Sequence, residues 1–144
     1  MGKKFELTDK FIINVFGIKL FQIKCTKSFK YAQKGDLGGY VEKEGNLDQE
    51  NDAWVYGNAQ VYGDANIKNN NEHCGFDGFG SCNRHTHAYL TKEKKVEITC
   101  GCFRGSIEEF EKKVEETHSG TIYEKQYKAI INVIKIKFGL TDLI

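Results

Sequence analysis

Residues 41–70 read VEKEGN, LDQEND, AWVYGN, AQVYGD and ANIKNN, five consecutive groups of six. The first residue of every group is apolar, the third is apolar in the last three groups, and the fifth and sixth are mostly Gly, Asn or Asp. A period of six fits neither a helix nor an ordinary strand, but it is typical of short parallel strands joined by tight turns. We therefore expect a short coil like a left-handed β-helix. Its first and third side chains point inward, and Trp54, Tyr56 and Tyr62 face solvent, a partner or another part of the chain.

The predicted coil is short. At about three groups per turn, five groups make fewer than two turns, and repeat structures need several stacked units to bury their interior. Flanking segments or other subunits must complete it. This deficit is the reason to expect a homo-oligomer.

Three stretches carry a resemblance to a known group of proteins. Residues 34–65, KGDLGGYVEKEGNLDQENDAWVYGNAQVYGDA, resemble the hexapeptide-repeat proteins of bacteriophages and prophages. Residues 80–92, GSCNRHTHAYLTK, and 101–120, GCFRGSIEEFEKKVEETHSG, are similar to the C-terminal module often attached to those repeats, with Cys82 where Arg is more usual. The resemblance implies a phage origin and an accessory role, but no particular reaction.

Composition and charge narrow the class of protein. The chain has 144 residues, 40% of them hydrophobic, and a net charge of +1, which argues against disorder. Residues 1–40 are basic, with eight lysines and three acids, residues 41–70 carry two lysines and six acids, and residues 71–144 are balanced. We interpret this as subunit complementarity rather than nucleic-acid binding, which usually needs a larger excess on one face.

No signal peptide or membrane-spanning run is evident, so we expect a cytoplasmic protein in the bacterial host, with reduced cysteines and no membrane partner.

The order of predicted elements gives an α+β fold in two modules, residues 1–70 and 71–144. A β-hairpin over residues 5–25 is followed by KGDLGG, which we interpret as a tight turn rather than a phosphate loop, because no helix follows it. A polar linker after Ile67 leads to two strands, HTHAYLT and KVEITCGC, the second with Cys100 and Cys102 facing the core. Two helices follow, the first beginning at Ser106 with a capping box and the second covering residues 122–138. The C-terminal module is therefore predicted as ββαα.

Metal binding and catalysis are both weakly supported. No CxxC pair is present, and two cysteines in a CxC on a strand suit a core better than a zinc site. A pair of Cys82 with His85 or His87 has no recognisable oxyanion hole, and the repeat lacks the histidine of hexapeptide acyltransferases. We predict no enzyme activity, no cofactor and no metal. The metal candidates that remain are Cys74, Cys82, His85, His87, Cys100, Cys102 and His118.

Recognition of an anion or nucleotide is better supported. Arg84 and Arg104 are the only two arginines, and a guanidinium matches phosphate geometry better than a lysine does. Arg104 also precedes a helix N-terminus, which attracts anions. The alternative is that both arginines pair with glutamates on the same surface. The predicted ligand-binding residues are Ser81, Asn83, Arg84, Thr86, Tyr89, Phe103 and Arg104.

The sequence therefore predicts a phage-encoded, non-catalytic, oligomeric protein that sequesters a small anionic, nucleotide-type signalling ligand and so counters host defence. The alternative is an inhibitor that binds a host defence nuclease complex through an exposed patch of Trp54, Tyr56 and Tyr62.

Overall fold

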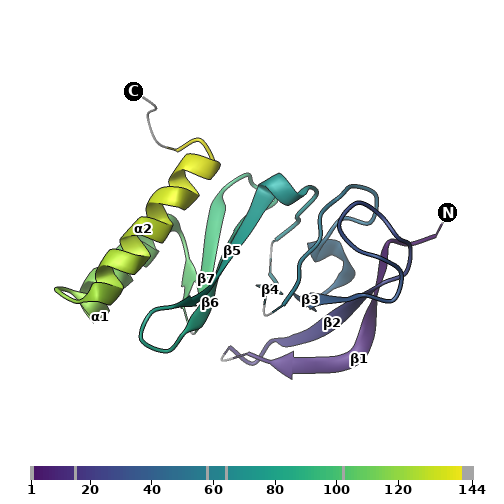
Figure 1. Cartoon of the computed structure of the whole chain (residues 1–144), viewed down its shortest axis with the longest axis horizontal. Coiled ribbons are helices and arrows are strands. Elements are labelled where there is room, and N and C mark those ends of the chain that lie inside the picture. The colour runs from purple at the N-terminus through teal and green to yellow at the C-terminus, as the bar shows by residue number, and fades with distance from the viewer. Residues whose placement is uncertain (1, 15, 58, 64, 102, 141–144) are drawn as a thin grey trace.

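The computed structural model describes residues 2–14, 16–57, 59–63, 65–101 and 103–140. These residues form an α+β structure in which two four-stranded sheets lie side by side and two helices cover the outer face of the second sheet (Figure 1). The strand orders are β1-β2-β3-β4 and β5-β6-β7-β8. The strands and helices are β1 Phe5–Ile13, β2 Lys19–Cys25, β3 Leu37–Val41, β4 Gln60–Val61, β5 His73–Phe79, β6 Arg84–Leu90, β7 Val96–Cys100, β8 Phe103–Gly105, α1 Ile107–His118 and α2 Ile122–Lys137.

The predicted β-helix-like coil is wrong. Within the described residues, the only parallel pairings of the hexad region are β3 with β4 and an isolated bridge between Leu47 and Ile67. The antiparallel hairpin of β1 and β2, itself predicted, adds to β3 and makes a mixed sheet instead of a solenoid. The physical reason is length, because fewer than two turns cannot stack into a ladder.

The inward side chains of the hexads are nevertheless buried. Ala53, Val55, Ala59, Val61, Ala65 and Ile67 are each at most 1% exposed. Trp54 joins this core and packs edge-on against Phe29, while Tyr89 of β6 closes it from the second sheet. The core is therefore completed by flanking segments of the same chain. The homo-oligomer remains a prediction, but the need for other subunits to fill the core no longer supports it.

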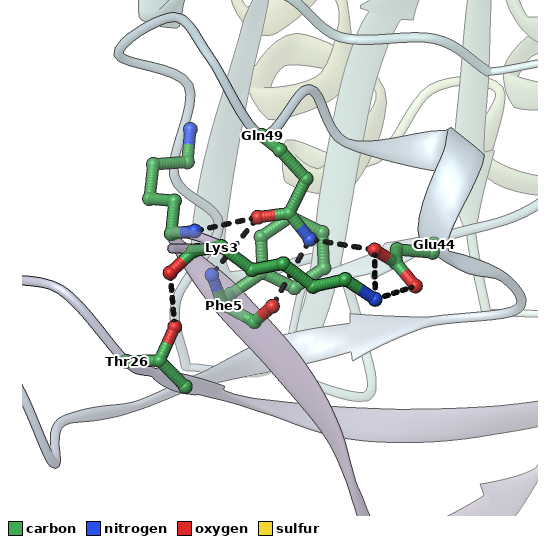
Figure 2. Close-up of polar contacts among 6 residues, drawn as sticks. Lys3, Phe5, Thr26, Glu44 and Gln49 are labelled. Atoms are coloured by element: carbon green, nitrogen blue, oxygen red, sulfur yellow. Dashed lines mark hydrogen bonds and ion pairs between the residues drawn. The ribbon is translucent and has the colours of Figure 1, made fainter. Parts of the chain in front are cut away.

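Gln49 connects the start of β1 to the hexad region (Figure 2). Its amide oxygen accepts hydrogen bonds from the backbone nitrogens of Lys4 and Phe5 at 2.7 and 3.0 Å. Its amide nitrogen donates to the Phe5 carbonyl and to Glu44, both at 3.0 Å. Because both the oxygen and the nitrogen of the Gln49 amide are hydrogen-bonded, the start of β1 is fixed in position against the hexad region.

The KGDLGG segment is only partly the predicted turn. Gly35, with φ of 97°, lies in the turn, but Gly38 and Gly39 belong to β3. A Cβ at Gly38 would come within 2.6 Å of the Val55 carbonyl oxygen, and one at Gly39 within 2.9 Å of that of Ala59. These two glycines therefore permit β3 to pack closely against the hexad region.

The C-terminal half has four strands, so the predicted ββαα order is wrong. The segment predicted as a polar linker contains β5, and β8 follows β7 before the first helix. Both helices are present as predicted. Ser106 and Glu109 form the reciprocal capping box of α1, and α2 begins at Ile122. Cys100 is buried as predicted, whereas Cys102 lies outside the described residues.

The two faces of the second sheet differ in chemistry. One face packs apolar side chains such as Ala88, Ile98 and Phe103 against the helices. By strand alternation, the other face presents polar residues toward the first sheet. No helix among the described residues is long and apolar enough to cross a membrane. The division into modules 1–70 and 71–144 stays a prediction.

Candidate functional site

Arg84 lies where two hollows adjoin. The first, here called the helix-side hollow, has a volume of about 160 Å³ and lies between the second sheet and the helices. The second, the sheet-side hollow, has a volume of about 310 Å³ and lies between the two sheets. Arg84 and Cys100 line both. The helix-side hollow is also lined by Ser81, Phe103, Phe110, Lys113, Val114, Thr117, His118 and Tyr127, and the sheet-side hollow by Ile12, Tyr40, Gln60, Tyr62, His85, Thr99 and Gly101.

Glycines make room for the polar groups around Arg84. A Cβ at Gly101 would come within 1.7 Å of an Arg84 guanidinium nitrogen, and one at Gly80 within 2.0 Å of the Tyr127 hydroxyl. Arg84 also interacts with Cys82, and hydrogen bonds from Arg84 and Ser81 lower the pKa of that exposed thiol. The guanidinium thus belongs to the first residue of β6 and lies on the wall of both hollows.

Positive charge and aromatic rings meet in the helix-side hollow. Arg84, Lys113 and His118 supply basic groups, while Phe103 and Tyr127 supply rings. Such a combination suits a small anion that carries an aromatic or apolar part, because stacking and charge act on different parts of the ligand.

The structure brings together three of the seven residues predicted to bind ligand. Ser81, Arg84 and Phe103 line the helix-side hollow. Asn83 is exposed in the turn before β6, where its φ of 49° is left-handed. Thr86 is completely buried and donates to the sulfur of Cys100 at 3.2 Å.

Tyr89 and Arg104 belong to a different cluster on the opposite face of the sheet. The Tyr89 hydroxyl donates to Glu97 at 2.6 Å, and Arg104 Nε donates to the same carboxylate at 2.9 Å. The Arg104 guanidinium lies 4.8 Å from the centre of the Tyr62 ring. For Arg104, the alternative reading of the sequence, a pair with a glutamate, describes what is observed.

No protein-family model and no curated protein matches this chain. The resemblance to phage hexapeptide-repeat proteins therefore stays a prediction.

Sequence reasoning missed a row of five polar side chains between the two sheets, here called the histidine array. Asp77 Oδ1 lies 2.6 Å from His85 Nδ1, His85 Nε2 lies 2.9 Å from His87 Nδ1, and His87 Nε2 lies 2.9 Å from His73 Nδ1. The row ends at Asn70, whose Oδ1 lies 3.1 Å from His73 Nε2. A hollow of about 270 Å³ runs beside it, lined also by Trp54 and Tyr56.

The surroundings of the array keep two of its rings neutral. His73 and His87 are 7% and 3% exposed, and burial lowers the pKa of His73 to about 4 and that of His87 well below its usual value. Gly75 leaves the space for the row, since a Cβ there would meet His85 at 2.7 Å and His87 at 2.8 Å. The ring nitrogens pair in line instead of converging, and no cluster of metal-ligating side chains occurs in the described part of the chain.

One signal in the sequence could have revealed this array. In HCGFD, His73 and Asp77 lie four positions apart, and in HTH, His85 and His87 lie two apart, so each pair falls on one face of a strand. The pairing of β5 with β6 then brings the two sets of residues side by side, because Gly75 pairs with His87 and Asp77 pairs with His85.

Proposed function

We propose that the protein is a non-catalytic binder of a small anionic, nucleotide-type ligand, with Arg84 as the central cation. The observation that carries the proposal is the position of Arg84 on the wall of both hollows, beside Lys113 and His118 and the rings of Phe103 and Tyr127. A planar guanidinium binds phosphate through paired donors, and the rings offer a surface for a base or another apolar group.

The ligand residues differ in part from those expected from the sequence. Ser81, Arg84 and Phe103 remain in the proposal, and Lys113, His118 and Tyr127 are added. Arg104 leaves it, because its guanidinium is already paired with Glu97 and packed on Tyr62. The wider role, capture of a nucleotide signal by a phage protein acting against host defence, rests on the sequence resemblance alone.

The burial of two aromatic residues favours this proposal over a surface inhibitor of a nuclease complex. The alternative requires Trp54, Tyr56 and Tyr62 to share an exposed patch. Trp54 and Tyr62 are 4% and 2% exposed, and Tyr56 alone is open, at 68%. Two of the three anchors would therefore have to leave their packing before they could touch a partner.

A ligand panel read by melting temperature tests the proposal. Pyrophosphate, ADP-ribose and a cyclic dinucleotide are added to the wild-type chain and to Arg84→Gln, with Arg104→Gln as the matched control. A ligand that binds only the folded state raises the melting temperature. We expect a shift that Arg84→Gln abolishes and Arg104→Gln retains. No shift with any of the three ligands, or an equal shift in both variants, would refute it. Light scattering on the same samples measures the mass of the protein in solution and so tests the predicted homo-oligomer.

A further inference from the structure

The histidine array contains four consecutive hydrogen bonds, from Asn70 through His73, His87 and His85 to Asp77. Each hydrogen bond needs one proton. A neutral imidazole carries one N–H and one acceptor nitrogen, so three neutral rings supply three protons. The proton for the fourth bond must come from one end of the row or be added to it.

The Asn70 end cannot supply that proton. Its Oδ1 accepts a hydrogen bond from the backbone nitrogen of Trp54 at 2.8 Å, and a backbone N–H can only donate. The atom facing His73 is therefore the carbonyl oxygen, and His73 Nε2 must donate to it. His73 Nδ1 then accepts from His87 Nε2, and His87 Nδ1 accepts from His85 Nε2.

The Asp77 end also presents an acceptor. With Nε2 of His85 already protonated, its Nδ1 faces a carboxylate oxygen at 2.6 Å. The Asp77 side chain is 63% exposed, so water stabilises its charge, whereas the rings of His73 and His87 are buried away from water. The additional proton belongs on His85, between its buried neighbours and the carboxylate.

We propose that the histidine array is a partly buried proton-binding site, which holds one proton more than three neutral imidazoles carry, and that this proton keeps His85 cationic on the wall of the sheet-side hollow. The role of the His85 charge rests on the proposed function, because His85 would attract an anion together with Arg84. Asp77 does not line that hollow, so the positive end of the His85–Asp77 pair is the end nearer the hollow and Arg84.

The groups around His85 set the direction of its pH dependence. Rising pH removes the proton, leaves two acceptors facing each other and takes a positive charge from the hollow. Anion affinity should therefore fall as pH rises. The charged and titratable groups that line the two hollows together with the array are Asp77 of β5, Arg84 of β6, Cys100 of β7, Tyr40 of β3, Tyr62 after β4, Tyr56 and Cys74. The charge of Lys137 also acts on His73.

Nitrogen-15 NMR of histidine-labelled full chain tests the proton directly. At pH 7 we expect His85 to be doubly protonated, and His73 and His87 to be neutral with the proton on Nε2. Asp77→Asn should leave all three rings neutral, because an amide can turn its NH₂ toward His85 Nδ1 and donate. His118→Gln, outside the array, should leave the three spectra unchanged. Three neutral rings in the wild type would overturn the proposal.

Sulfate, a dianion that does not titrate near neutral pH, tests the second part. We expect wild-type affinity for sulfate to fall roughly five- to tenfold as His85 loses its proton, the size of one unit charge acting across a partly solvated hollow. At pH 7, Asp77→Asn should bind sulfate more weakly than the wild type does. If sulfate binds with no pH dependence while His85 is protonated, the coupling is wrong. If His85 is protonated and neither sulfate nor the ligand panel binds, the proposed function fails and the proton site alone stands.

Discussion

Arg104 donates through Nε to Oε1 of Glu97 at 2.9 Å, in a partly buried position between the two sheets. The second carboxylate oxygen of Glu97 accepts from the hydroxyl of Tyr89, which is completely buried. Burial and this hydrogen bond raise the pKa of Tyr89, so the phenol remains a donor. The Glu97 carboxylate thus accepts one hydrogen bond from Tyr89 of β6 and one from Arg104 of β8.

Replacement of Glu97 by Gln should destabilise the protein. An amide has one acceptor oxygen and would set its NH₂ against one of the two donors, so we expect a loss of about 1–3 kcal/mol in the free energy of unfolding. Urea denaturation measures it. Glu93→Gln, at an exposed position, is the control and should change little. Equal stability of the two variants would show that the bridge contributes nothing.

Lys4 provides a second test of buried polar groups. Its ammonium donates to the carbonyl oxygens of Asn51 and Ala53 at 2.7 and 2.6 Å. Lys4→Met leaves both carbonyls without this partner and should cost about 1–3 kcal/mol in urea unfolding. The matched control is Lys3→Met, which breaks only an exposed ion pair with Glu44 and should cost at most about 0.5 kcal/mol. A larger loss for Lys3→Met would contradict this account.

The same lysine should make stability depend on alkaline pH. Burial lowers the pKa of Lys4 to about 8 from 10.5. Between these values the unfolded chain holds a proton that the folded chain has released, so this group's contribution to stability increases as pH rises through that window. Urea midpoints at pH 7.5 and 9.5, compared between wild type and Lys4→Met, measure it. A steeper rise in the variant would contradict the assignment.

Acid pH should act through His73. Its folded pKa of about 4 lies below the usual 6.5, so the unfolded chain binds the proton first. The contribution of His73 is complete above pH 6.5 and is lost as pH falls through 4, on the order of 3 kcal/mol in total. We expect wild type to lose more stability than His73→Gln between pH 7 and 4.5. Parallel pH profiles for the two proteins would refute the prediction.

Gly38 and Gly45 form a matched pair for the packing of β3. A Cβ at Gly38 meets the Val55 carbonyl, Ile23 and Trp54 at 2.6–2.8 Å, whereas one at Gly45 meets nothing within 4 Å. Gly38→Ala should cost about 1–3 kcal/mol through overpacking, and Gly45→Ala less than about 0.5 kcal/mol. Thermal unfolding followed by circular dichroism compares them. Similar melting temperatures for the two variants would mean that β3 and the hexad region move apart to accept the added methyl group at little cost.

Local patterns in the sequence predicted local structure well. The inward columns of the hexads, the first hairpin and the capping box of Ser106 and Glu109 each depend on residues within a few positions of one another, and all are present. The contribution of Tyr89 to the core of the hexad region could not be predicted, since it depends on how the second sheet lies against the first. β5 was not predicted, because the glycines within it and the asparagines before it favour a linker.

The candidate site shows the same limit. Arg84 and Arg104 belong to neighbouring segments of the sequence, yet the pairings of β6 with β7 and of β7 with β8 place them on opposite faces of one sheet. The histidine array likewise requires the pairing of β5 with β6. Neither pairing is encoded in a motif of one segment.

The position of Tyr89 determines how the protein should behave when its two halves are expressed as separate fragments. Its strand belongs to the second sheet, but its ring fills the interior formed by the first. Expressed separately, fragments 1–70 and 71–144 would each expose apolar side chains that the other fragment normally covers. Each fragment should therefore aggregate into inclusion bodies when expressed alone, and both should be soluble when they are co-expressed.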